Sequence, residues 1–168
     1  MGQIFQYYVE GQCEQKMIDT MKLPGTKTIK PGKVSVFNVV QNRFTDLHLR
    51  QLKNGTIVIL VFDTDKGDSE ILESNIKYLR QYRTIKDVWL IPEVTNFEEE
   101  LLYSTNIKSV KELIPSRSTA EFKGDFCKEK NLTKKLEQHS FDSRRFWSRR
   151  AKGTAFCDLK NDHDMVFV

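Results

Sequence analysis

Two spacings of apolar residues alternate along the first half of the chain. Residues 4–9, 33–40, 57–62 and 88–91 are rich in β-branched and aromatic side chains, and each run ends at polar or turn-forming residues. Such runs are typical of β-strands. The run 57–62 is apolar without a break, which favours a central parallel strand that is covered on both faces. We therefore expect these runs to form the strands of one sheet, with the fourth strand ended by Pro92.

Helical spacing fills the gaps between these runs. Cys13, Met17 and Met21 fall on one face of a helix, and residues 44–52 could form a second, shorter helix. Ser69, or the aspartate before it, can cap a third. Strands and helices then alternate, which predicts an α/β fold of the Rossmann-like kind. Its mostly parallel sheet would have about four strands, flanked by helices and joined by right-handed crossovers.

The second half of the chain loses the strand pattern. Helical spacing occurs at residues 96–103, 107–114, 118–127 and 132–139. Residues 142–151 are a candidate basic helix, and residues 165–168 are a candidate terminal strand. We therefore expect an α/β core over residues 1–105 and a helical, basic C-terminal extension over residues 106–168 that packs on it.

Composition places the chain among ordinary soluble proteins. It has 168 residues, of which 39% are hydrophobic and 30% are charged. No apolar run is long enough to cross a bilayer, and the N-terminus lacks the features of a secretory signal. Cys13, Cys127 and Cys157 are odd in number and not closely spaced. We expect reduced thiols in a cytoplasmic protein that does not bind a membrane.

The net charge of +4 is concentrated in one short stretch between Asp142 and Lys152. Arginines there flank the aromatic pair Phe146-Trp147, an arrangement that suits phosphate contact together with base stacking. In the alternative interpretation, the aromatic residues dock the segment on the core and the arginines face water. The candidate nucleic-acid-binding residues of this stretch are Arg144, Arg145, Arg149, Arg150 and Lys152.

Acidic residues close two of the predicted strands. Glu10 follows the first strand, and Asp63 and Asp65 follow the run 57–62. The carboxyl ends of parallel strands meet at one edge of a sheet, so these side chains should converge there. Crowded carboxylates repel one another unless a hard divalent cation lies between them. The pattern predicts a Mg²⁺ site, with Mn²⁺ as a substitute; the alternative is a set of solvated turns.

These motifs resemble the TOPRIM domain of topoisomerases, bacterial primases and OLD-family nucleases. The matching stretches are Val9-Glu10-Gly11 and Phe62-Asp63-Thr64-Asp65-Lys66-Gly67. Among the branches of that family, the chain looks most like the small OLD and RloB-like proteins of bacterial defence systems. There a second acid often follows the first by one helical turn, as Glu14 does here, and another follows the fourth strand, where Glu98 stands.

The resemblance implies a metal-dependent nuclease that acts on DNA or RNA. Glu10, Asp63 and Asp65 would be catalytic and hold one Mg²⁺, and Glu14 and Glu98 would hold a second. Glu10 could instead be the general base. Lys66, beside the aspartates, would either touch a phosphate or lie in an exposed turn.

The chain departs from the family in two respects. No Arg-Glu-Gly follows the aspartates, which argues against a topoisomerase, and no ATPase domain accompanies the motifs, so a separately encoded partner ATPase is one expectation. Two rival functions stay open. One is a non-catalytic nucleic-acid-binding or regulatory subunit, and the other is a transferase that binds a nucleotide sugar through Asp63 and Asp65.

Overall fold

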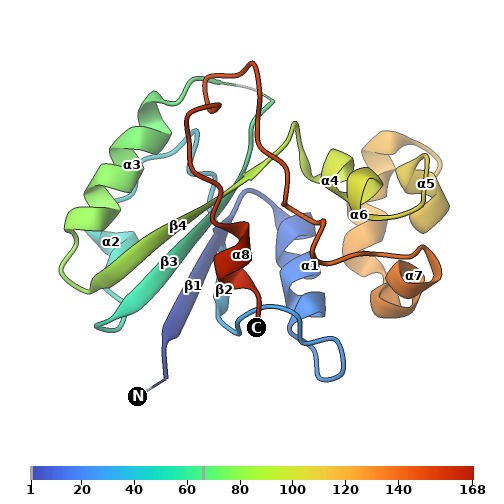
Figure 1. Ribbon diagram of the computed structural model, residues 1–168, viewed down its shortest axis with the longest axis horizontal. Helices are drawn as coiled ribbons and strands as arrows, with labels where there is room; N and C mark the ends of the chain where they lie inside the picture. The colour runs from blue at the N-terminus through green and yellow to red at the C-terminus, as the bar shows by residue number, and fades with distance from the viewer. Residues whose placement is uncertain (1, 66) are drawn as a thin grey trace.

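The computed structural model describes residues 2–65 and 67–168 of the chain and shows a parallel sheet between two layers of helices (Figure 1). In that part of the chain the sheet has four strands in the order β2-β1-β3-β4, and neighbouring strands are parallel. The predicted α/β class is therefore confirmed. The strands are β1 (Ile4–Val9), β2 (Lys33–Val36), β3 (Thr56–Asp63) and β4 (Ile85–Glu93).

Helices cover both faces of the sheet. α2 and α3 lie on one face, and α1 and α4 to α7 lie on the other, with the short α8 near the C-terminus (Figure 1). Ile57, Ile59 and Val61 of β3 pack toward α1, whereas the alternate residues pack toward α3. This two-sided burial explains why β3 is apolar without a break. The helices are α1 (Gln12–Met21), α2 (Asp46–Leu49), α3 (Glu70–Gln81), α4 (Phe97–Ser104), α5 (Val110–Leu113), α6 (Thr119–Lys128), α7 (Leu132–Gln138) and α8 (His163–Val166).

Two predicted strand ends were wrong. β4 continues through Pro92 to Glu93, because β4 is an edge strand and tolerates a residue without an N–H. Leu90 turns its backbone N–H and carbonyl to the outer edge, so Pro92, two residues on, lacks its N–H on that same side. β2 ends at Val36 instead of continuing to residue 40. Just beyond it, the Asn38 side chain accepts hydrogen bonds from two backbone N–H groups and turns the chain.

The predicted basic helix over residues 142–151 is also wrong. The segment consists of turns, and Trp147 has a positive φ of 67°. Its backbone N–H donates to Glu100 on α4, and its carbonyl accepts from Asn161. These tertiary hydrogen bonds satisfy the backbone in place of helical ones. At the C-terminus, α8 replaces the expected strand, and Phe167 forms an isolated antiparallel β-bridge with Ile29.

Residues 106–168 do not form a separate core. Phe122, Phe126 and Phe146 belong to the same buried cluster as Met17 of α1 and Phe97 of α4. In the part of the chain that the structure describes, no helix is both long and apolar enough to span a bilayer.

Candidate metal centre

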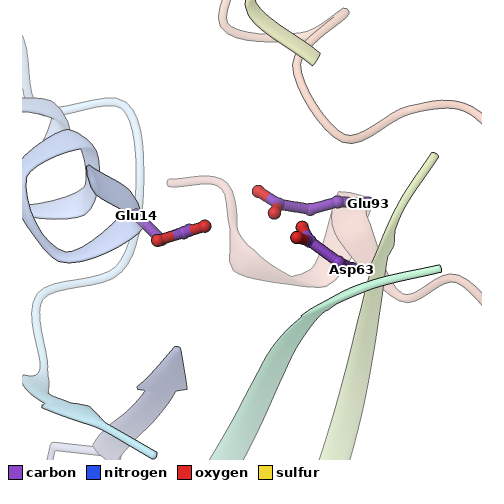
Figure 2. Close-up of side chains that lie close together, drawn as sticks. All are labelled: Glu14, Asp63 and Glu93. Carbon is purple, nitrogen blue, oxygen red and sulfur yellow. The ribbon is translucent and has the colours of Figure 1, made fainter. Parts of the chain in front are cut away.

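Three carboxylates meet at the edge of the sheet where the parallel strands end. Glu14 comes from the first turn of α1, Asp63 from the last residue of β3 and Glu93 from the last residue of β4 (Figure 2). One oxygen from each of these side chains lies within 4.8 Å of the others. Glu93 is 0% exposed and Glu14 is 3% exposed. We call these three residues the carboxylate cluster.

Two oxygens of the cluster have no hydrogen-bond partner among the described residues. They are Oδ1 of Asp63 and Oε2 of Glu93, and both are buried. A buried carboxylate oxygen without a partner is strongly unfavourable, so native proteins supply a proton, a water or a cation. The cluster therefore has unused capacity for a positively charged ligand.

Burial and the charges of neighbouring carboxylates raise the pKa of each carboxyl group in the cluster. Desolvation is the largest cause for Asp63. The Glu93 side chain opposes it, but the charges of Glu10, Glu14 and Asp65 add to it, and the pKa of the Asp63 carboxyl rises to about 7. Desolvation also raises the pKa of Glu93 well above its ordinary value, and Glu14 and Asp63 add to it. The pKa of Glu14 is raised, mainly by burial. Protons therefore neutralise the cluster more readily than ordinary carboxylates. Once the carboxyl groups ionise, a bound cation is needed to offset their repulsion.

Glu10 lies beside the cluster and is held by two donors. Asn38 Nδ2 donates to one of its oxygens at 2.8 Å, and the backbone N–H of Asp63 donates to the other at 3.1 Å. The structure thus brings Glu10 and Asp63 together at one edge, as their positions at the ends of two strands predict. The two hydrogen bonds fix the orientation of a half-buried carboxylate.

An open pocket of about 640 Å³ is lined by Asp63 of the carboxylate cluster and by the neighbouring Glu10. Asp65 and Glu98, both expected metal ligands, line this acidic pocket, and neither belongs to the carboxylate cluster. Asp65 is exposed, and Glu98 is half-buried and lies 3.5 Å from the ammonium of Lys123. The other lining residues include Glu10, Asn38, Asp63, Asp68 and Asn96.

Lys123 of α6 brings a positive charge to the mouth of the acidic pocket. Partial burial opposes its charged form, but Glu98, Glu14 and Asp63 outweigh that effect and raise the pKa of the ammonium group. The side chain is still 58% exposed. An ammonium group beside carboxylates and open to solvent can contact a phosphate that enters the pocket.

Three arginines of the basic segment, residues 142–152, contact other residues of the same chain. Arg145 and Arg149 both lie over the ring of Tyr103, at 4.6 and 4.5 Å from its centroid. Arg149 also bonds the buried carboxylate of Glu100 at 3.1 Å, and Arg144 lies over Phe167. The remaining expected phosphate contacts are Arg150 and Lys152, which are exposed, and Lys66, which lies outside the described residues.

Phe146 and Trp147 are fully buried, so they dock the segment on the core and do not stack on bases. This is the alternative interpretation of the aromatic pair. Trp147 also contacts the carboxylate cluster, because its indole Nε1–H donates to Oε1 of Glu93 at 2.8 Å. That bond orients Glu93 and leaves its other oxygen available.

Glu93 and Lys123 were not among the expected site residues. The sequence carried a signal for Glu93, since it closes a strand in the same way as Glu10 and Asp63. The expectation that this strand ends at Pro92 leaves Glu93 outside the strand, so its position at the strand end is missed. For Lys123 there was no such signal, because only the packing of α6 beside α1 brings it to the pocket.

No protein-family model, curated protein or solved structure matches this chain. Function is therefore inferred from the carboxylate cluster and the residues around it.

Proposed function

We propose that the protein is a Mg²⁺-dependent phosphodiesterase that hydrolyses nucleic acid, with a site of the TOPRIM type. The observation that carries the proposal is the convergence of Glu14, Asp63 and Glu93 at the carboxyl ends of parallel strands, where α/β sheets bind their ligands. A further carboxylate, Glu10, lies against Asp63. The choice of nucleic acid among phosphate esters rests on the motifs that resemble TOPRIM nucleases.

The residues present fit a hard divalent cation. Carboxylate oxygens are the donors that Mg²⁺ prefers, and two of the buried oxygens in the cluster have no partner among the described residues. Glu14, Asp63 and Glu93 would hold the ion, while Glu10, Asp65 and Glu98 would bind a second ion or its waters. When bound, the metal supplies a more acidic water and stabilises negative charge on the phosphate.

The chain itself contributes binding and orientation. Lys123 pairs with a phosphate oxygen at the mouth of the acidic pocket and so holds the scissile group against the carboxylates. Glu10, oriented by Asn38 and by the Asp63 N–H, accepts a proton from the attacking water or positions that water. The Trp147 indole N–H donates to Glu93 and so holds the orientation of its carboxylate.

A cleavage assay with single- and double-stranded DNA and RNA tests the proposal. We expect cleavage with Mg²⁺ or Mn²⁺, none with EDTA, and a loss of at least about a hundredfold in Asp63→Asn. Asp158→Asn, which removes an exposed carboxylate outside the cluster and the acidic pocket, is the matched control. Equal activity in wild type and Asp63→Asn would refute the proposal. Salt-sensitive binding without cleavage would support the rival, a non-catalytic binding or regulatory subunit.

A further inference from the structure

Two cysteines face each other beside the carboxylate cluster. Cys13 of α1 and Cys127 of α6 are far apart in the chain, yet their sulfur atoms are 3.9 Å apart. The Cys13 thiol is also 3.6 Å from the backbone carbonyl of Lys123, the residue that brings the positive charge to the acidic pocket. This pair therefore joins the two helices that supply Glu14 and Lys123 to the site.

Both cysteines line one pocket beside the carboxylate cluster. Cys13 and Cys127 line a second pocket of about 330 Å³ that also borders Glu10, Glu14 and Asp63. Cys13 itself is buried, whereas Cys127 is partly exposed. A small oxidant entering this thiol pocket meets Cys127 first. Cys157, the third cysteine, is exposed and lines neither pocket.

We propose that Cys13 and Cys127 form a reversible disulfide that regulates the metal centre. The sulfur atoms of a disulfide are about 2.05 Å apart, so rotation about the two Cα–Cβ bonds, with a small approach of α1 and α6, must close the observed gap. The regulatory part rests on the proposed function; formation of the bond does not.

The chemistry requires a peroxide as oxidant. The Cys127 thiolate attacks hydrogen peroxide, forms a sulfenic acid and releases hydroxide. The Cys13 sulfur, after losing its proton, then attacks the Cys127 sulfur and expels a second hydroxide as the disulfide forms. The two thiol protons convert both hydroxides to water, so two thiols and one peroxide give one disulfide and two waters. A small dithiol reverses the reaction by thiol–disulfide exchange.

The new bond would act on the cluster through α1, the helix that carries both Cys13 and Glu14. Cys13 is the neighbour of Glu14, so movement of Cys13 toward α6 changes the position of Glu14 relative to Asp63 and Glu93. Such a shift disturbs the arrangement of the three carboxylates that would hold the cation. We expect the oxidised protein to bind Mn²⁺ about tenfold more weakly than the reduced protein. Affinity falls by a similar factor when a residue that orients a metal ligand is substituted.

The bond itself is tested in a Cys157→Ser background, which leaves only the proposed pair. After brief treatment with peroxide and alkylation, we expect an intact mass lower by two hydrogen atoms, no alkylated thiol and a cross-linked peptide that contains Cys13 and Cys127. A dithiol should restore both alkylation sites. Cys127→Ser in the same background should gain no such link. Alkylation of both thiols after oxidation, or only dimers linked between chains, would overturn the proposal.

The regulatory effect is tested by titrating Mn²⁺ into the reduced and oxidised forms of the Cys157→Ser protein, with Cys13→Ser/Cys127→Ser/Cys157→Ser as the control that cannot respond to peroxide. Equal affinity in the two forms would end the regulatory proposal. Absence of Mn²⁺ binding even in the reduced protein would instead count against the proposed function and would end the regulatory proposal with it. The mass measurement then still decides whether the disulfide forms.

Discussion

Glu93 belongs to both the buried core and the carboxylate cluster. One oxygen accepts the buried indole N–H of Trp147, and the other points into the cluster with no hydrogen-bond partner in the described part of the chain. The two functions can be separated by substitution, because a glutamine keeps a side-chain oxygen for the indole but loses the charge that a cation needs.

We expect Glu93→Gln to retain most of the stability while losing Mg²⁺ affinity by at least about tenfold. Glu93→Leu should also lose affinity, and in addition it leaves the Trp147 N–H unpaired in the core, at a cost of about 1–3 kcal/mol. Urea unfolding without metal measures stability, and calorimetry measures affinity. Equal destabilisation by the two variants would show that the indole bond does not distinguish them.

Asp63 should make the stability of the metal-free protein depend on pH. The carboxyl ionises near 3.8 in its ordinary state, and its pKa rises to about 7 in the fold, chiefly through burial. Between these values the folded state binds more protons than the unfolded chain, so stability falls as the pH rises through the window. The raised pKa values of Glu14 and Glu93 act in the same direction.

We therefore expect the metal-free protein to melt at a lower temperature at about pH 8 than at about pH 5, and Mg²⁺ to stabilise it more at the higher pH, where fewer protons compete. Asp63→Asn stays neutral throughout, so its melting temperature should fall less with pH and gain little from Mg²⁺. Scanning calorimetry across this range, with Asp158→Asn as the control, measures both effects. A melting temperature of the metal-free protein that rises from pH 5 to pH 8 would contradict the assignment.

At the scale of elements, three carboxylates of the site come from strand ends. Glu10 follows β1, Asp63 ends β3 and Glu93 ends β4, and parallel pairing brings these ends to one edge of the sheet. The first two positions were predictable, because apolar runs locate buried strands and the residue after each run is visible in the sequence. Glu93 was not predicted as a site residue, because a proline marks the end of a strand in most contexts. The strand continues past Pro92 because β4 lies at the edge of the sheet.

The basic segment shows the opposite case, in which local spacing was misleading. The positions of its arginines suit a helix face, but Glu100 on α4 determines the conformation. The carboxylate of Glu100 is 0% exposed and accepts the backbone N–H groups of Val94 and Trp147 as well as the Arg149 guanidinium. Such long-range hydrogen bonds leave no periodic trace in the sequence, so they could not be foreseen.

Removing Glu100 should therefore release the segment. We expect Glu100→Ala to destabilise the fold by about 3–5 kcal/mol, because it leaves Arg149 partly buried without its carboxylate and two backbone N–H groups unpaired. Arg150→Ala, at an exposed neighbouring position, should change stability by no more than about 0.5 kcal/mol. Urea unfolding compares the two. If Glu100→Ala were as stable as wild type, its carboxylate would not hold the segment.

Across the whole molecule, the C-terminal residues complete both the core and the site. Lys123 lines the acidic pocket, Trp147 bonds Glu93, and Asp162 bonds the backbone of Leu90 on the outer edge of β4. The expected boundary at residue 105 corresponds to the point where the strand pattern ends. Periodicity reveals which segments are helical, but not which distant segments share one hydrophobic core.

A fragment that ends at residue 105 tests whether the α/β half folds by itself. We expect it to lack cooperative unfolding, because α4 would lose the aromatic contacts that cover it. The ring of Phe97 packs against Phe126 at 5.2 Å and against Phe146 at 6.2 Å between centroids, and all three side chains are fully buried. Exposing one such aromatic side chain lowers the free energy of unfolding by about 1.5–3 kcal/mol. In the fragment α1 also loses its contacts with α6.

Thermal unfolding by circular dichroism and the dispersion of amide resonances measure this directly, with the full-length chain as reference. Adding residues 106–168 as a separate fragment should restore cooperative unfolding, since both halves of the shared core are then present. Restoration would also return Lys123 to the acidic pocket and Trp147 to Glu93 of the carboxylate cluster. The affinity for Mn²⁺ should therefore recover with the fold. Sharp unfolding and dispersed resonances in the isolated fragment would show instead that the α/β half is an independent domain and that the remaining helices are an accessory to it.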